Sequence, residues 1–293
     1  MSTQSKAPMS GAKMKKRVTN VIVHIILAIL SFIWVLPIFW VIVTSFREKQ
    51  GQYVTTFFPA SYTLNNYKKL FTDTSILNFP KMFMNTLIIA IFTCIISTIF
   101  VLSVSYCMSR MRFKMRKPFM NFAMILGLFP GFMSMIAVYY ILKVIGLSEG
   151  AMIRVALVLV YSAGSGIGFY VAKGFFDTIP KALDEAAIID GATRWQVFTR
   201  ITIPLSKPII VYTILTAFMG PWLDFIFAKV ICRANAEYFT VSIGLWKMLE
   251  KEYIHGWYTC FAAGAVVVSI PIAVLFLFTQ KFYVDGMSGA VKG

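Results

Sequence analysis

Six long apolar runs constrain the fold of this chain more than any other feature of its sequence. The runs extend over 21–44, 84–108, 119–142, 155–172, 207–230 and 258–279, and each contains few or no charged residues. In a helix, about 20 consecutive apolar residues match the thickness of the hydrocarbon core of a bilayer, and the helix satisfies its own backbone polar groups. The pattern therefore predicts an all-α polytopic membrane protein with six transmembrane helices.

The composition excludes a water-soluble globular protein. Of the 293 residues, 58% are hydrophobic and 14% are charged, and the mean hydropathy is +0.75. So few polar side chains cannot cover the surface of a globule in water. The four cysteines include no CxxC pair, so we expect neither a disulfide framework nor a zinc site.

The positive charge points to membrane orientation and not to nucleic acid. The formal net charge is +16, but Lys and Arg lie in short segments beside the apolar runs instead of forming a stripe on a polar face. With six spans, most of these cations fall on the side that holds both termini. Because positive loops stay on the cytoplasmic side, we expect a multi-pass protein of the cell (plasma or inner) membrane with both termini cytoplasmic.

This topology divides the chain into three parts. A basic cytoplasmic tail covers residues 1–20, a six-helix transmembrane domain covers 21–283, and a second cytoplasmic tail covers 284–293. The first apolar run is too long to be the core of a cleavable signal peptide. The outer segments 45–83 and 231–257 are long for a compact membrane protein, and such loops usually contact a partner.

The densest cluster of charge lies in the short inner loop over 109–118. Its cations are Arg110, Arg112, Lys114, Arg116 and Lys117. One interpretation is a solvated loop that faces phospholipid headgroups. The other is a contact with a cytoplasmic partner, and the sequence leaves both open.

Glycine and proline interrupt several of the apolar runs. They occur as Pro37, Gly127-Leu128-Phe129-Pro130-Gly131, Gly164-Ser165-Gly166-Ile167-Gly168, Gly220-Pro221 and Pro271. A bilayer tolerates broken backbone hydrogen bonding only where protein or water supplies partners, so these positions either kink a helix or line a water-filled cavity. Close packing of small residues is the alternative explanation.

A few side chains in the spans are candidates for a solute pathway. Asp224 is the one carboxylate that we place in a span, and it either lines the pathway or reaches the outer interface. Tyr139, Tyr161 and Trp222 could stack on sugar rings, although most aromatic side chains in such a chain pack against helices or anchor them at the interface. The scarcity of carboxylates in the spans disfavours an ion-coupled carrier.

The longest inner loop, over 173–207, contains the most informative pattern. Good helix formers follow Pro180 and predict a short helix over 181–189, Gly191 permits a bend, and a second amphipathic helix follows over 193–202. Ala186 and Ala187 give the first helix a small-residue face that another surface can approach closely. An interfacial loop without a partner is the alternative. The chain has no GxxxxGK[ST] phosphate loop and no catalytic cluster, so energy for transport has to come from another chain.

This loop resembles the EAA loop of ABC importer permeases. The matching residues are Glu185, Ala186, Ala187, Asp190, Gly191, Ala192, Ile201 and Pro204, with Ile203 where that family usually has Leu. The likeness extends to Asn85-Thr86, Trp222-Leu223-Asp224-Phe225 and the last ten residues, which are similar to the ending of MalG-like carbohydrate permeases. The chain thus resembles the MalG-like half of a carbohydrate importer, with the MetI/MalG-like permease fold.

The resemblance implies a non-catalytic subunit of a heteromeric transporter. It implies a second MalF-like permease, two ATP-binding-cassette subunits that use ATP and Mg²⁺, and an extracytoplasmic solute-binding protein that delivers a sugar, for example an oligosaccharide such as maltodextrin. This chain would itself hold no cofactor and no metal. The Glu185–Ala192 segment, with Ile201 and Pro204, would dock the ATPase. An ABC permease for a non-sugar solute is an alternative, and a stand-alone secondary carrier or channel is a more distant one.

Overall fold

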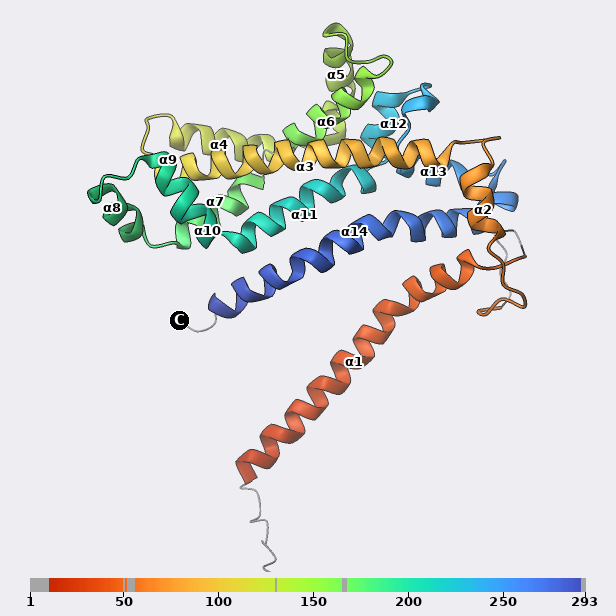
Figure 1. The fold of residues 1–293 in the computed structure, drawn as a ribbon, viewed down its shortest axis with the longest axis horizontal. Coiled ribbons are helices and arrows are strands. Elements are labelled where there is room, and N and C mark those ends of the chain that lie inside the picture. Colours follow the sequence, from red (N-terminus) through yellow and green to blue (C-terminus); the bar gives the residue numbers. More distant parts are fainter. Residues whose placement is uncertain (1–10, 50, 52–55, 130, 165–167, 291–293) are drawn as a thin grey trace, which may run out of the picture.

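The computed structural model describes residues 11–49, 51, 56–129, 131–164 and 168–290, and these residues are almost wholly helical. Within those ranges the structure contains no β-strand, and its β-structure is limited to an isolated bridge between Arg47 and Tyr62. Three long helices, α3 (Phe79–Arg110), α11 (Lys207–Leu223) and α14 (Ile254–Ala290), lie side by side (Figure 1). The predicted all-α class is therefore confirmed.

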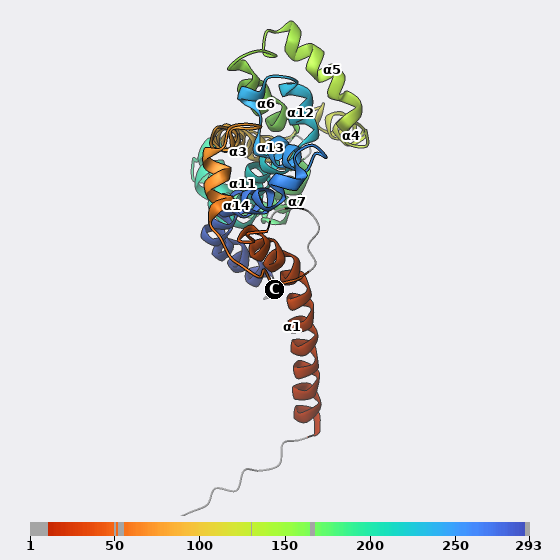
Figure 2. The same ribbon diagram turned by 90° about the vertical axis from the view of Figure 1, so that its right-hand side faces the viewer.

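The first helix, α1 (Gly11–Ser45), meets this bundle near its carboxyl end and then diverges from it (Figures 1 and 2). Its end is buried at Val43, Thr44 and Ser45, where the Ser45 hydroxyl hydrogen-bonds with Tyr67 Oη at 2.7 Å. Over 15–39 the apolar side chains are exposed, as in Trp34 at 77%. Such a surface requires lipid or another apolar helix to cover it.

Helix α3 contributes buried side chains to two apolar cores. The larger core joins it to α2 (Asn65–Thr72), α6 (Met152–Gly164), α13 (Val241–Met248) and α14, around fully buried side chains of Phe79, Ile89, Leu157, Ile231 and Met248. The smaller core lies at the other end of α3, where Val101 and Leu102 contact α7 (Gly168–Thr178) and α11. The helix begins where the Asn78 side chain accepts a hydrogen bond from the Lys81 N–H, which satisfies one of the free donors of the first turn.

Three helices are long and apolar enough to cross a membrane, over Lys15–Ser45, Phe79–Arg110 and Ile254–Phe282. They contain the predicted spans 21–44, 84–108 and 258–279. Two bent helix pairs raise the number to five if each pair counts as one span. The six predicted spans are thus confirmed only in part.

The other three predicted spans are interrupted. The run 119–142 is divided between α4 (Arg116–Gly127) and α5 (Gly131–Val144), and the run 155–172 is divided between α6 and α7, with a bend of 45°. Glycine-rich sequence lies at both joints, as predicted, although residues 130 and 165–167 lie outside the described part of the chain. Pro37 and Pro271, in contrast, lie within continuous helices.

The run 207–230 is not one helix, and the break falls at Asp224 instead of at Gly220-Pro221. Helix α11 ends at Leu223, and a short helix α12 (Ile226–Cys232) follows. The Asp224 carboxylate accepts hydrogen bonds from the N–H groups of Phe227 at 3.3 Å and Ala228 at 2.9 Å. An acidic side chain that satisfies free N–H groups in this way stabilises the start of a helix, so the carboxylate favours a new helix after the break.

The predicted carboxyl-terminal tail is also helical over most of its length. Helix α14 continues through 284–290, and residues 291–293 lie outside the described part of the chain. At the other end, α1 begins at Gly11, inside the predicted tail 1–20. The first and last helices thus extend beyond the predicted apolar runs toward the two termini of the chain.

Close packing at Gly264 gives a test of this bundle. A Cβ atom at Gly264 would lie 2.7 Å from Leu245 Cδ2 and 3.4 Å from Phe79 Cε2, whereas nothing lies within 4 Å of a Cβ at the exposed Gly174. We expect Gly264→Val to destabilise the protein by about 1–3 kcal/mol through overpacking. Thermal unfolding of the purified chain in detergent measures this. Gly174→Val is the matched control, and equal melting temperatures for the two variants would contradict the packing.

Candidate functional site

The loop predicted between 173 and 207 forms a bracket of short helical segments at the end of the bundle opposite α2 and α13 (Figure 1). Its elements are α8 (Lys181–Ile189), α9 (Arg194–Val197), a π-helical turn (Phe198–Thr202) and α10 (Ile203–Leu205). The helix predicted over 181–189 has those bounds. The second predicted helix is present as α9 and the π-helical turn, and α10 extends it to Leu205.

Local sequence determines the shape of this bracket. Gly191 has φ +87°, a left-handed conformation that favours glycine, and its N–H donates to the Ile188 carbonyl at 3.0 Å to end α8. Thr193 then starts α9 with a capping box: its Oγ1 accepts from the Gln196 N–H, and Gln196 Oε1 accepts from the Thr193 N–H. The predicted bend at Gly191 is therefore confirmed.

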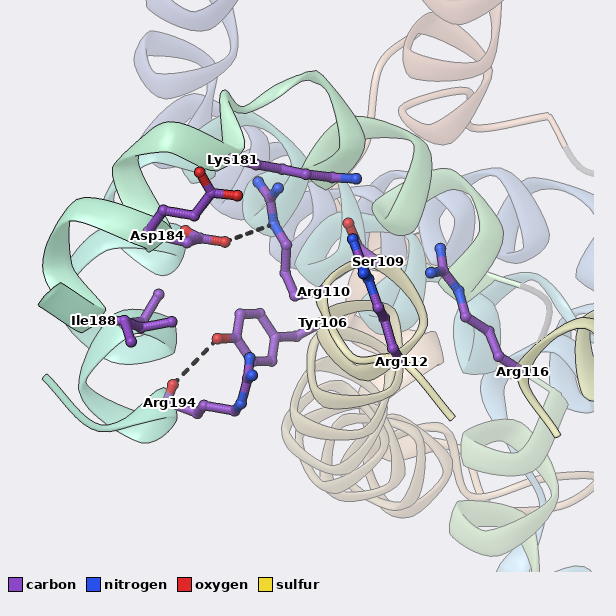
Figure 3. Close-up of a pocket in the computed structure, with 11 residues that line it drawn as sticks. Tyr106, Ser109, Arg110, Arg112, Arg116, Lys181, Asp184, Ile188 and Arg194 are labelled. Atoms are coloured by element: carbon purple, nitrogen blue, oxygen red, sulfur yellow. Dashed lines mark hydrogen bonds and ion pairs between the residues drawn. The ribbon is translucent and has the colours of Figure 1, made fainter. Parts of the chain in front are cut away.

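A buried ion pair ties the bracket to α3. Arg110 Nε lies 3.2 Å from Asp184 Oδ2, and the two side chains are 3% and 12% exposed. Arg110 Nη2 also donates to the carbonyls of Phe176 at 2.8 Å and Ile179 at 2.9 Å, which precede α8. Figure 3 shows Arg110 and Tyr106 reaching from α3 toward α8 and Arg194, whose carbonyl accepts from Tyr106 Oη at 3.2 Å.

The residues of the EAA-like pattern lie on the outside of the bracket. Glu185, Ala186, Asp190, Gly191 and Pro204 are exposed, and Ala187, Ala192 and Ile201 are half-buried. Large apolar side chains are exposed beside them, with Ile189 at 85% and Trp195 at 69%. Exposed apolar side chains next to polar ones are typical of a protein contact surface. The sequence analysis did not single out Trp195, because one Trp on a short amphipathic helix carries no signal of its own.

Two adjoining cavities lie within the helical bundle, and both are lined by Tyr161 and Gly220. One has a volume of about 280 Å³ and lies among α3, α7 and α11; the other, of about 620 Å³, lies among α5, α6 and α12. Asp224 lines the larger cavity, and its Oδ2 accepts a hydrogen bond from Tyr161 Oη at 2.8 Å. A carboxylate and a hydroxyl group thus meet at the larger cavity.

The other two candidate pathway residues lie differently. Trp222 is 2% exposed and packs against the rings of Phe83 and Phe218, so the structure places it in the apolar core and not along a cavity. Tyr139 lies on α5 beside the cavity-lining Val138, and its hydroxyl accepts from Arg233 Nη1 at 2.7 Å. Among the described residues, no group of three His, Cys, Asp or Glu side chains could hold a metal ion.

At the opposite end of the bundle, Asn85 and Thr86 anchor the segment over 231–257. Asn85 donates to the carbonyls of Glu237 at 2.9 Å and Phe239 at 3.2 Å, and Thr86 Oγ1 accepts from the Val241 N–H at 2.9 Å. The hydrogen bond from Lys81 lowers the pKa of the exposed Glu237 carboxyl, so it stays ionised as the pH falls through its ordinary range. The sequence identified Asn85-Thr86 only by resemblance, and these contacts explain their role.

The fold and the site together indicate the class of protein to which this chain belongs. The chain is a polytopic helical membrane protein that presents a rigidly anchored contact surface at one end of its bundle. Residues 102–288 match the family model described as binding-protein-dependent transport system inner membrane component. This chain therefore belongs to the family of binding-protein-dependent inner-membrane transport components, which are membrane permease subunits of ABC transporters.

Curated relatives match almost the whole chain. It is 32% identical over 287 residues to the galactooligosaccharides transport system permease protein GanQ of Bacillus subtilis, covering 97% of this chain and 100% of the relative. It is 34% identical over 293 residues to the maltodextrin transport system permease protein MalD of Streptococcus pneumoniae, covering 97% and 99%. The predicted MalG-like carbohydrate permease resemblance is thereby confirmed.

A solved structure supports the fold. The chain resembles a chain of a bacterial ABC transporter involved in the import of the acidic polysaccharide alginate, with a TM-score of 0.74 and 21% identity. The match covers 95% of this chain and 100% of that chain. This chain therefore shares the fold of that chain.

The Arg110–Asp184 pair yields a prediction about the bracket. Asp184→Ala leaves the buried guanidinium of Arg110 without its counter-ion, so we expect a loss of about 3–5 kcal/mol in the free energy of unfolding. Glu185→Ala removes the neighbouring exposed carboxylate and should change it by less than about 0.5 kcal/mol. Unfolding in detergent and limited proteolysis of the bracket measure both. If the two variants behave alike, the pair does not anchor the bracket.

Proposed function

We propose that this chain is a transmembrane permease subunit of an ATP-driven importer for an oligosaccharide. Its relatives include galactooligosaccharide and maltodextrin permeases, which supports this class of solute. The chain has no phosphate loop in its sequence, so ATP and Mg²⁺ are used by two partner ATPase subunits and this chain is not the catalyst. A second permease subunit completes the pathway.

One observation carries the proposed coupling: the bracket is anchored firmly on its inner face and exposed on its outer face. Arg110, Tyr106 and the Phe176–Ile179 carbonyls hold it to the bundle, while Glu185, Ala186 and Ile189 are exposed. In the proposed mechanism Glu185 pairs with a basic group of the ATPase, Ala186 and Ala187 allow close approach, and Gly191 sets the bend. ATP-driven movement of the partner then moves the bracket and the helices attached to it.

The arrangement of the helices supports the proposed orientation. The bracket, the end of α14 and the beginning of α1 lie toward the same end of the molecule (Figure 1). The cluster of cations after α3 lies at this end as well, which the positive-inside rule assigns to the cytoplasm. In this orientation both termini are cytoplasmic, and the segment over 231–257 faces the solute-binding protein on the outside.

Asp224 and Tyr161 are the residues of this chain that we propose along the solute pathway. Both line the larger cavity, and they offer a carboxylate and a phenol hydroxyl, groups that hydrogen-bond with sugar hydroxyls. Tyr139 lies next to this cavity and Trp222 supports it from the core. The exposed apolar face of α1 is then covered by membrane lipid or by the second permease.

The bend at Gly191 provides a test of coupling. Gly191→Val forces a β-branched residue into a left-handed conformation, so it should distort the bracket and lower ATP-dependent uptake by about tenfold or more. Gly191→Asn is the matched control, because Asn tolerates this conformation best among the other residues, and it should retain most of the uptake. Uptake and ATPase stimulation are measured in proteoliposomes that contain the co-purified partners. Unchanged uptake and ATPase stimulation in Gly191→Val would contradict the proposed mechanism.

Reconstitution distinguishes this function from its alternatives. Liposomes that contain the chain alone should take up no oligosaccharide, whereas the complex co-purified from the native membrane should do so when ATP and the binding protein are supplied. Transport by the chain alone would instead establish a stand-alone carrier or channel. ATP-dependent uptake of a non-sugar solute, with no uptake of maltodextrin or galactooligosaccharide, would establish an ABC permease of different specificity.

A further inference from the structure

A pocket lies between the bracket and the end of α3. Its volume is about 350 Å³. The lining residues come from α3, the loop after it, the first residue of α4, α8 and α9 (Figure 3): Tyr106, Ser109, Arg110, Arg112, Arg116, Lys181, Asp184, Glu185, Ile188, Arg194 and Val197. The EAA-like pattern contributes Glu185 to its wall, and the other lining residues lie outside that pattern.

Cations outnumber carboxylates in its wall by five to two. Asp184 Oδ2 is paired with Arg110 while its buried Oδ1 has no hydrogen-bond partner, and Glu185 has no ion pair. Within the described part of the chain, the side chains of Arg112, Lys181 and Arg194 also have no ion pair or hydrogen bond. The pocket therefore holds an excess of positive charge that the described residues do not balance.

One buried donor in the wall also lacks a partner. The Arg110 side chain is 3% exposed. Its Nη2 donates to backbone carbonyls and its Nε lies within ion-pair distance of Asp184, but Nη1 has neither a hydrogen-bond acceptor nor an ion pair. A buried charged donor without an acceptor is costly, so a bound oxygen atom would stabilise it. The hydroxyl groups nearby are already used, because Ser109 donates to Asp177 Oδ1 at 2.6 Å and Tyr106 donates to the Arg194 carbonyl. What remains for a ligand is a set of guanidinium and ammonium donors.

These donors fit one kind of ligand. Guanidinium groups bind phosphate oxygens through paired, charge-assisted hydrogen bonds, and a phosphate offers enough oxygen atoms for several cations at once. We propose that this pocket binds a phosphate-bearing anion, which bridges the loop after α3 to the bracket. The source is either the headgroup of an anionic phospholipid, since the pocket lies where α3 ends, or a free phosphate compound. Binding at this pocket does not depend on the proposed transport function.

The loop after α3 supplies a matched pair of variants. Arg112 and Arg116 line the pocket, whereas Lys114 and Lys117 lie in the same segment, are exposed and do not line it. The test variant is Arg112→Gln with Arg116→Gln, and the control is Lys114→Gln with Lys117→Gln, which removes the same charge. Arg110 stays unchanged, because its loss would leave Asp184 unpaired.

Two probes identify the source of the phosphate. The full chain in detergent is titrated with pyrophosphate, and the full chain in nanodiscs is compared between phosphatidylcholine alone and phosphatidylcholine with phosphatidylglycerol, with bound lipid counted after purification. For at least one probe we expect the arginine variant to lose affinity by about tenfold or more, because it loses two charge-assisted contacts, and the lysine variant by less than about twofold. Loss of pyrophosphate binding assigns a free phosphate compound, and loss of phosphatidylglycerol assigns a lipid headgroup. An equal loss in both variants, or no binding of either probe to the unaltered chain, would overturn the site.

Discussion

The position of the bracket depends on the buried contact between Arg110 and Asp184. The Arg110 guanidinium, at the last residue of α3, joins that helix to α8 through Asp184 and to the end of α7 through two backbone carbonyls. Leaving either charge without the other inside a protein is costly, so the pair holds the three elements in one arrangement. Because α3 is also shared by both apolar cores, this single side chain connects the exposed contact surface to the packing of the whole bundle.

Hydropathy predicted the helical class but not the continuity of the helices. A window of apolar residues has the same composition whether it forms one straight helix or two bent ones. The run 207–230 illustrates this, because one carboxylate, Asp224, ends α11 and begins α12 through hydrogen bonds to backbone N–H groups. Gly220-Pro221 carries the stronger breaking signal in sequence, yet α11 continues through it. A local hydrogen-bonding side chain, and not the Gly-Pro pair, therefore marks the break in this run.

The same distinction applies to the site. Helix α8 and the bend at Gly191 follow from local sequence, since helix formers and a left-handed glycine act over a few residues. The inward role of Asp184 could not be predicted, because it depends on Arg110, which lies far away in sequence. Asp184 and Glu185 are adjacent acidic residues in sequence, but the 100° turn per residue of a helix directs one to the buried pair and leaves the other exposed.

The helices that hold the bracket also line the cavities. Helix α3 carries Arg110 at its end and contributes Thr93 and Val101 to the smaller cavity, and α11 leaves the bracket at an angle of 84° and contributes Gly220 to both cavities. Buried side chains of both helices pack together in the core near α7, so in the proposed mechanism displacement of the bracket displaces the cavity wall as well. A phosphate bound between α3 and α8 would make the contact between these two helices more rigid. The same chain segment would then transmit force from a partner and respond to the composition of the surrounding membrane or cytoplasm.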